Sequence, residues 1–216
     1  MDASTQQLTD RLTTAFAAAG HATARPWLWP ALLKLLGRGE AVTTTQLADT
    51  TGKSEDEVRH ALATLPDTEY DAAGRIVGSG ITLNPTPHRF TVDGRQLFTW
   101  CALDTLVFPA VLGRPAEVES PCHTTHATVR LTVEPGRVTR TDPATAVISL
   151  VTPDDLTAVR SAFCNHVHFF ASHHAAAPWL AEHPEATTVP VQQALAVGQL
   201  LATAFQQDPG QAGCCC

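Results

Sequence analysis

The chain has 216 residues, of which 44% are hydrophobic, enough for one large domain or two small ones around an apolar core. No apolar run approaches the roughly 20 residues that span a bilayer, and the N-terminus lacks a basic segment followed by an apolar one, so we expect a cytoplasmic protein with reduced cysteines and no membrane contact. The formal net charge of −7 argues against general binding to nucleic acid.

The first two predicted helices cover residues 4–19 and a segment that begins at Pro26. In the first, apolar side chains recur every four residues, at Leu8, Leu12 and Phe16, which is the spacing of one helix face. In the second, PWLWPALLKLLGRG, apolar residues lie nearly all round the helix axis. This second helix should therefore be buried.

The next segment, TTTQLADTTGKSEDEVRHALATL, predicts a helix, a turn at Thr51-Gly52 and another helix. Ser54 is the expected N-cap of the later helix, and Glu57 completes a capping box. The stretches TEYDAAGRIVGSGITL and HRFTVDGRQLFTW predict strands, with Asp93-Gly94 as the signal of a hairpin turn. Three helices followed by a small ribbon predict a winged-helix-like N-terminal domain, which we assign to residues 1–82.

Winged helices often bind DNA, but the charges of this one oppose such a role. Residues 1–80 hold seven Lys and Arg against ten Asp and Glu, a net charge of −3. The helix that would enter the DNA groove begins SEDEVRH, with three acids in its first turn, whereas contact with phosphates requires positive charge. We therefore expect a packing module.

The second part of the chain, residues 83–207, predicts a mixed core of strands and helices. CALDTLVFPAVLG predicts a short apolar helix, and PDDLTAVRSAF and VQQALAVGQLLATAF predict two more. Several strands are expected between the first two helices, with turns at residues 134–136 and 141–143. Residues 208–216 have no periodicity and form a Cys-rich tail. The predicted fold class is α+β.

Cys101 and Asp104 are the first candidate reactive residues. We expect Cys101 in the first turn of a helix capped by Thr99, where the helix dipole favours thiolate. Asp104 lies three residues later, on the same helix face. Its charge would raise the pKa of the thiol, and its apolar neighbours would raise its own pKa, as a proton donor requires. A buried cysteine beside a capping acid is the alternative.

The stretch SAFCNHVHFFASHH contains the next candidate thiol, Cys164. If CNHVHFF is extended, Cys164, His166 and His168 share one face and could bind zinc or copper. Hydrogen-bonded core histidines are the favoured alternative. Arg160, four residues before the thiol, either points toward the same region or forms a surface ion pair, and we favour the ion pair.

The remaining cysteines form no CxxC pair, so their spacing is not that of a zinc finger. Cys122 lies close to His123 and His126 in a strand-rich segment. This C-H-x-x-H pattern could bind metal, but a small buried thiol is the favoured interpretation.

Two strings, WCALDTLVFPAVLGR and FCNHVHFFAS, together resemble the organomercurial lyase (alkylmercury lyase) family. TEYDAAGRIVGSGITL and PWLWPALLKLLGRG also fit, so the resemblance covers roughly residues 25–205. It implies a winged-helix-like domain followed by a catalytic core of strands and helices. It also implies that Cys101, Asp104 and Cys164 are catalytic and that Cys122 is structural.

The chemistry that this resemblance implies is protonolysis of a carbon–mercury bond in alkyl- or arylmercury compounds. Mercury is a soft cation, and thiolate is the softest protein ligand. Cys101 and Cys164 would bind the mercury, and Asp104 would move a proton from a thiol to the carbon, which leaves as hydrocarbon. Hg(II) would remain on both sulfurs until low-molecular-weight thiols remove it, and no cofactor is expected. Candidate pocket-lining aromatics are Trp100, Phe163 and Phe169.

Two features depart from the family pattern. Asn165 follows Cys164 where many relatives have a second cysteine, and the chain ends in Cys214, Cys215 and Cys216. Adjacent thiols on a mobile tail have a high effective concentration. The tail could therefore accept Hg(II) and pass it on, with mercuric reductase as a possible acceptor, or it could be dispensable.

Two other functional classes remain open from the residues alone. One is a metal-responsive regulator built on the winged helix, which its acidic helix disfavours. The other is a zinc-binding protein that uses Cys164, His166 and His168.

Overall fold

The computed structural model describes residues 6, 7, 10–12, 14, 27–65, 67–152 and 158–206. The residues described between 6 and 14 are helical, as expected. Leu8, Phe16, Pro26 and the tail from residue 207 lie outside the described residues. No helix in the described part of the chain is long and apolar enough to cross a membrane.

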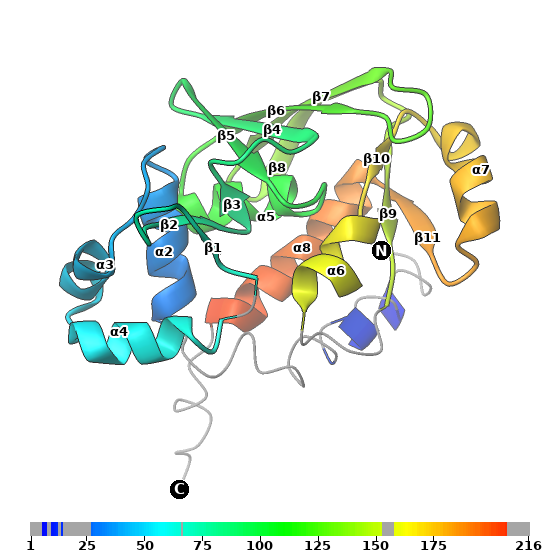
Figure 1. Ribbon diagram of the computed structural model, residues 1–216. Helices are drawn as coiled ribbons and strands as arrows, with labels where there is room; N and C mark the ends of the chain where they lie inside the picture. The colour runs from blue at the N-terminus through cyan, green and yellow to red at the C-terminus, as the bar shows by residue number, and fades with distance from the viewer. Residues whose placement is uncertain are drawn as a thin grey trace, which may run out of the picture.

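Three short helices of the first part of the chain, between residues 28 and 62, pack together (Figure 1). Helix α2, Leu28–Leu36, is buried over most of its length. Helices α3, Thr44–Thr51, and α4, Glu55–Leu62, form the predicted helix–turn–helix, and Gly52 ends α3 with a φ of 67°. Both helices begin with a capping box, which stabilises a helix start by satisfying free backbone N–H groups.

The first turn of α4 is acidic. Glu55, Asp56 and Glu57 occupy it, and Arg59 forms ion pairs with Glu55 and Asp56 at 2.9 and 2.7 Å. The positive charge of Arg59 is thus neutralised by its own helix. This surface does not have the charge that phosphate binding requires.

A large antiparallel sheet follows, in the order β1-β2-β3-β5-β4-β6-β7-β8. In chain order, its strands are β1 Glu69–Tyr70, β2 Ile76–Ser79, β3 Ile81–Thr82, β4 His88–Val92, β5 Arg95–Thr99, β6 Ala116–Pro121, β7 Thr128–Glu134 and β8 Arg137–Asp142. The predicted hairpin turn at Asp93-Gly94 is confirmed, because both residues have positive φ, 49° and 75°. The strands before and after residue 82 belong to this one sheet. The domain boundary that the sequence predicts at residue 82 therefore stays a prediction.

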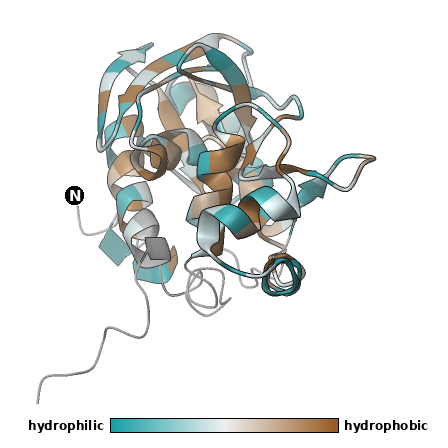
Figure 2. Ribbon diagram, turned by 90° about the vertical axis from the view of Figure 1, so that its left-hand side faces the viewer, coloured by the Kyte–Doolittle hydropathy of each residue, from teal (hydrophilic) through white to brown (hydrophobic). Residues whose placement is uncertain are grey.

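One face of the large sheet covers the core. Residues of β6 and β7 alternate between buried and more exposed positions, and Figure 2 shows the matching alternation of hydrophobic and hydrophilic colours along the strands. Helices α5, Asp104–Leu112, and α8, Val191–Gln206, lie beneath this sheet (Figure 1). They pack closely, since a Cβ at Gly198 would lie 2.7 Å from a Val107 methyl carbon.

A small second sheet completes the fold, in the order β10-β9-β11. Its strands are β9 Val147–Leu150, β10 Phe169–Phe170 and β11 Thr187–Pro190. Helix α6, Val159–Ala162, a 3-10 turn over Cys164–His166 and helix α7, His173–Glu182, surround it. The helix-turn-helix segment and a mixed core of helices and antiparallel sheet confirm the predicted α+β class.

Candidate active site

Cys101, Asp104 and Cys164 meet in the core. Their two sulfurs and a carboxylate oxygen all lie within 4.8 Å of one another. Cys101 is fully buried, Cys164 is 5% exposed and Asp104 is partly buried. Among the residues that the structure describes, this is the one group of three or more His, Cys, Asp or Glu that could hold a metal ion.

Backbone hydrogen bonds bring the two thiol-bearing segments together. The N–H of Ala102 donates to the carbonyl of Val167 at 3.1 Å, which ties the residue after Cys101 to the loop after Cys164. Buried Ser149 of β9 holds the same loop, because its hydroxyl donates to the His166 carbonyl and accepts from the His168 N–H, both at 2.8 Å. The loop after Cys164 is therefore held both by the segment that carries Cys101 and by strand β9.

The predicted helix start at Cys101 is wrong. Helix α5 begins at Asp104, and the Asp104 carboxylate accepts from the N–H of Cys101 at 3.2 Å. Thr99 is not an N-cap, since its hydroxyl donates to the Cys101 carbonyl at 2.9 Å. Cys101 thus precedes the helix and does not lie in its first turn.

Burial dominates the proton affinities of this site. It raises the pKa of the Cys101 thiol and raises the pKa of Asp104 to about 7. A hydrogen bond with Cys101 lowers the pKa of Cys164, but burial and the negative charge of Asp104 outweigh it, so that pKa is raised as well. The predicted rise in the Asp104 pKa is confirmed. Near neutral pH the site therefore combines two protonated thiols with a carboxyl group that can exchange a proton.

The extended conformation predicted for CNHVHFF is also wrong. Cys164–His166 form a 3-10 turn, and regular strand begins only at Phe169. The reason is local: the His166 and Val167 N–H groups bond back to the carbonyls of Phe163 and Cys164. The three proposed zinc ligands consequently do not line one face, and they form no metal-holding group within the described chain.

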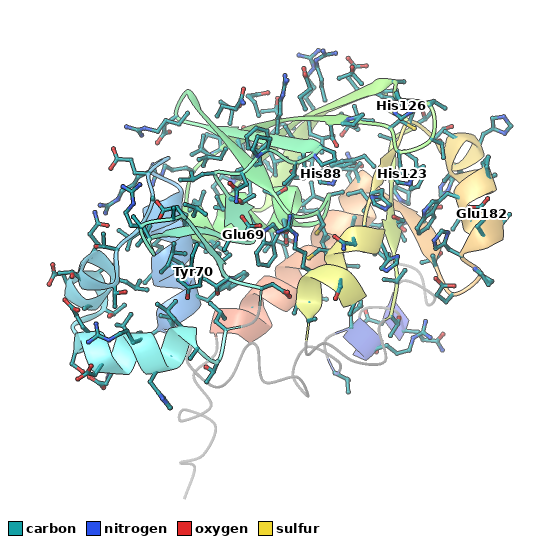
Figure 3. The ribbon with its side chains drawn as sticks, viewed as in Figure 1. Glu69, Tyr70, His88, His123, His126 and Glu182 are labelled. Atoms are coloured by element: carbon teal, nitrogen blue, oxygen red, sulfur yellow. The ribbon has the colours of Figure 1, made fainter. Side chains whose placement is uncertain are left out.

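His168 belongs instead to a stack of aromatic rings. It lies parallel to the ring of His123 at 3.9 Å, and both rings meet the Trp179 ring edge-on. Burial lowers the pKa of His168 to about 3 and also lowers that of His123. Figure 3 shows His123 on the opposite side of the molecule from α2, α3 and α4. His168 is half-buried and His123 is exposed, so these rings lie at the edge of the core, not inside it as the favoured alternative predicts, and their lowered pKa values keep them neutral near pH 7.

Cys122 is fully buried away from the three-residue site. Its N–H donates to the Ala127 carbonyl at 2.7 Å, and its sulfur lies 3.6 Å from the Thr124 hydroxyl. Burial raises its pKa, but hydrogen bonds from Thr125, the Ala171 backbone and Thr124 bring it down to about 7. Within the described residues, Cys122, His123 and His126 form no group that could hold a metal.

The aromatic candidates occupy different places. Trp100 and Phe163 directly precede the two thiols in the chain, and Phe163 is buried. Phe169 lies in β10 and packs edge-on against His88, with ring centroids 6.0 Å apart.

Arg160 forms an ion pair, as the favoured interpretation predicts, but its partner is not a surface acid. Its guanidinium lies over the Trp100 ring, 5.3 Å from the centroid, and pairs with Glu69, whose side chain is only 14% exposed. Sequence reasoning did not single out Glu69. Its hydrogen-bond partners Trp100 and Arg160 lie 31 and 91 residues away along the chain, so no local pattern could have revealed it.

Comparisons with known proteins match the whole length of the chain to one family. The family model "Alkylmercury lyase" matches residues 81–203, and "Helix-turn-helix domain of alkylmercury lyase" matches residues 7–80. The chain is 59% identical to an alkylmercury lyase of Streptomyces lividans over 215 residues, which is 100% of both chains. It is 42% identical to one of Pseudomonas putida, over 92% of this chain and 93% of the relative.

A solved structure is similar as well. The crystal structure of the mercury-bound form of MerB2 aligns with a TM-score of 0.74 at 27% sequence identity. The alignment covers 93% of this chain and 99% of that one. The likeness therefore extends over nearly the whole fold.

Proposed function

The chain belongs to the alkylmercury lyase family, and from this premise we propose that it cleaves carbon–mercury bonds by protonolysis, with Cys101 and Cys164 as mercury ligands and Asp104 as proton shuttle. The observation that carries the proposal is the meeting of two sulfurs and one carboxylate oxygen within 4.8 Å. Two thiolates suit a soft metal. A carboxyl group with a pKa of about 7 suits proton transfer at neutral pH.

The reaction begins when one enzyme thiol replaces the thiol that carries the organomercurial, so that a sulfur–mercury bond forms and the carrier leaves protonated. The Asp104 carboxylate then takes the proton of the second thiol, and this thiolate bonds to mercury. The carbon–mercury bond breaks with its electron pair on carbon, which takes the proton from Asp104. The products are a hydrocarbon, Hg(II) on two thiolates and a regenerated carboxylate.

The surroundings support the same reaction. Burial of the site excludes water. The electrostatic interactions inside it are therefore stronger, and the proton is not lost to solvent. Trp100 and Phe163 are the aromatics that we propose to contact the organic group, because they adjoin the two thiols in the chain. Phe169 is a further candidate from the sequence. Low-molecular-weight thiols would then remove Hg(II).

A direct test is to incubate the protein with phenylmercury or methylmercury and excess thiol, and to measure benzene or methane by gas chromatography. We expect one hydrocarbon for each Hg(II) produced. If the protein binds intact organomercurial and no hydrocarbon is released, the result would contradict lyase activity. The protein would then be a mercury-binding protein.

We also propose that the terminal thiols, Cys214, Cys215 and Cys216, accept Hg(II) from the active site and pass it to thiols or to mercuric reductase. Deletion of residues 214–216 should slow Hg(II) release when external thiol is limiting, because the deletion removes thiols held at high effective concentration. Replacement of all three by serine is the matched control for tail length. An unchanged release rate would mean that the tail is dispensable.

We predict a structural role for Cys122. Cys122→Ala should lower the free energy of unfolding by about 1–2 kcal/mol, since it empties a buried site and leaves the Thr124 hydroxyl without its sulfur contact. Urea denaturation followed by tryptophan fluorescence measures this change. Hydrocarbon release at saturating substrate should stay close to that of the wild type. A variant with unchanged stability and no activity would overturn the assignment.

A further inference from the structure

The Glu69 carboxylate of β1 collects four hydrogen bonds in a largely buried position. Its Oε1 accepts from Trp100 Nε1 at 2.9 Å and from the Arg160 guanidinium. Its Oε2 accepts from the Thr82 hydroxyl at 2.5 Å and from Asn84 Nδ2 at 2.7 Å. Burial raises the pKa of Glu69, but these hydrogen bonds and the charge of Arg160 outweigh burial and hold it below its usual value. Glu69 is therefore a fixed, charged acceptor.

The donors to Oε1 belong to the two segments that carry the thiols. Trp100 directly precedes Cys101, and Arg160 lies on α6, which leads into the 3-10 turn that begins at Cys164. The Arg160 guanidinium also lies over the Trp100 ring, a favourable cation–π contact. A single oxygen atom thus joins both segments, in addition to the backbone bond between Ala102 and Val167.

We infer that Glu69 is a positioning residue for this reaction: from the helix-turn-helix part of the chain, it fixes the Cys101 and Cys164 segments relative to each other. The inference rests on the proposed function, because only a reaction that needs both sulfurs on one mercury depends on this spacing. Misplacement of reacting groups by about 1 Å can cost on the order of a hundredfold in rate. The N-terminal domain then has a role in catalysis that needs no DNA.

Gly78 of β2 provides the space for this carboxylate. A Cβ at Gly78 would lie 2.5 Å from Glu69 Oε2 and 2.8 Å from the Thr82 hydroxyl. The φ of Gly78 is not positive, so alanine is compatible with the backbone there and only the space is lacking. Gly78→Ala should therefore displace the carboxylate while leaving it in the chain.

The test compares three variants with the wild type. Glu69→Ala removes the acceptor, Gly78→Ala displaces it, and Trp100→Phe removes one donor while keeping an aromatic ring beneath Arg160. We expect kcat for hydrocarbon release to fall about ten- to a hundredfold in Glu69→Ala and less in Gly78→Ala, with KM changed little in both. Because Trp100 is also proposed to contact the organic group, Trp100→Phe is judged by its retention of Hg(II), which carries no organic group. We also expect each variant to lose Hg(II) faster to a competing dithiol, because the two sulfurs no longer share the metal in an optimal geometry.

Glu119→Ala is the matched control. Glu119 also accepts from two arginines, Arg89 at 3.3 Å and Arg130 at 3.0 Å, but on the exposed face of the large sheet. Exposed ion pairs contribute little to stability, so the unfolding midpoint, kcat and Hg(II) retention should stay near wild-type values. Unfolding midpoints of all variants identify any that are merely less stable.

Wild-type kcat and Hg(II) retention in folded Glu69→Ala would overturn the inference. If Glu69→Ala does not fold, Gly78→Ala and Trp100→Phe decide, and unchanged values in both would equally overturn it. Failure of the proposed lyase function can be told apart from failure of the inference about Glu69. If the proposed function is wrong, the wild type releases no hydrocarbon. Hg(II) retention would still report whether Glu69 sets the spacing of the two sulfurs.

Discussion

Cys101→Ala and Cys164→Ala should each abolish hydrocarbon release, with a loss of at least about a thousandfold in kcat/KM. In the proposed mechanism the two thiolates act differently, since one binds the organomercurial and the other adds the electron density that weakens the carbon–mercury bond. Groups that act as a unit are strongly non-additive. The double variant should therefore keep about the same residual activity as each single variant. Gas chromatography of the benzene released from phenylmercury would measure these activities.

Cys122→Ala is the matched control, because it also replaces a fully buried cysteine but lies outside the three-residue site. It should keep its activity and bind one Hg(II) at the active site as tightly as the wild type does. Either single active-site variant should lose Hg(II) readily to a competing dithiol. Substantial hydrocarbon release by Cys101→Ala or Cys164→Ala would contradict a mechanism that needs both sulfurs.

Asp104→Asn should slow hydrocarbon release by about 10²–10⁴-fold, the usual contribution of a positioned acid or base. The amide keeps an oxygen that can accept from the Cys101 N–H, as the carboxylate does at 3.2 Å, but it cannot carry a proton. Binding of Hg(II) by the two thiols should persist. Normal turnover by this variant would refute the proton shuttle.

The same carboxyl group predicts a pH dependence of kcat/KM. Asp104 must be ionised to take the thiol proton, and burial raises its pKa to about 7. Activity should therefore fall as the pH decreases through about 7, and this limb should be missing from the residual activity of Asp104→Asn. Rates measured from about two pH units below that value to about two units above it would test this.

Stability should show the opposite trend. The folded protein holds the Asp104 proton more tightly than the unfolded chain, because the pKa rises on folding from 3.8 to about 7. This group therefore makes the free energy of unfolding decrease as the pH rises through that interval. Asp104→Asn should be more stable than the wild type above pH 7, and the advantage should shrink as the pH falls toward 4. Urea midpoints at several pH values would detect this.

Local signals in the sequence were sufficient for much of the fold. The capping box at Ser54 and the Asp93-Gly94 hairpin are confirmed, because each depends on residues within three or four positions of one another. The helix over CALDTLVFPAVLG is confirmed in type, but it begins three residues later than predicted. Helix starts depend on which acceptor takes the first N–H groups, and here Asp104 and Val167 take those of Cys101 and Ala102.

The sequence by itself determined the chemical identity of the site: two thiols and a carboxyl group, in strings that resemble one family. Spacing could not bring Cys101 and Cys164 together, because they lie far apart in the chain. Only the tertiary structure decided that, through the Ala102–Val167 bond and the anchoring of the loop by Ser149. It also decided the proton affinities of the thiols, since burial is a property of the folded core.

Glu69 is the clearest case of what only the tertiary structure decided. Nothing near it in the chain distinguishes it from a surface acid of a small strand. Its importance comes from donors that folding brings from distant parts of the chain, including Trp100 and Arg160. Residue types and short-range patterns set which reactions are possible, whereas long-range packing sets the distances and desolvation on which a reaction depends.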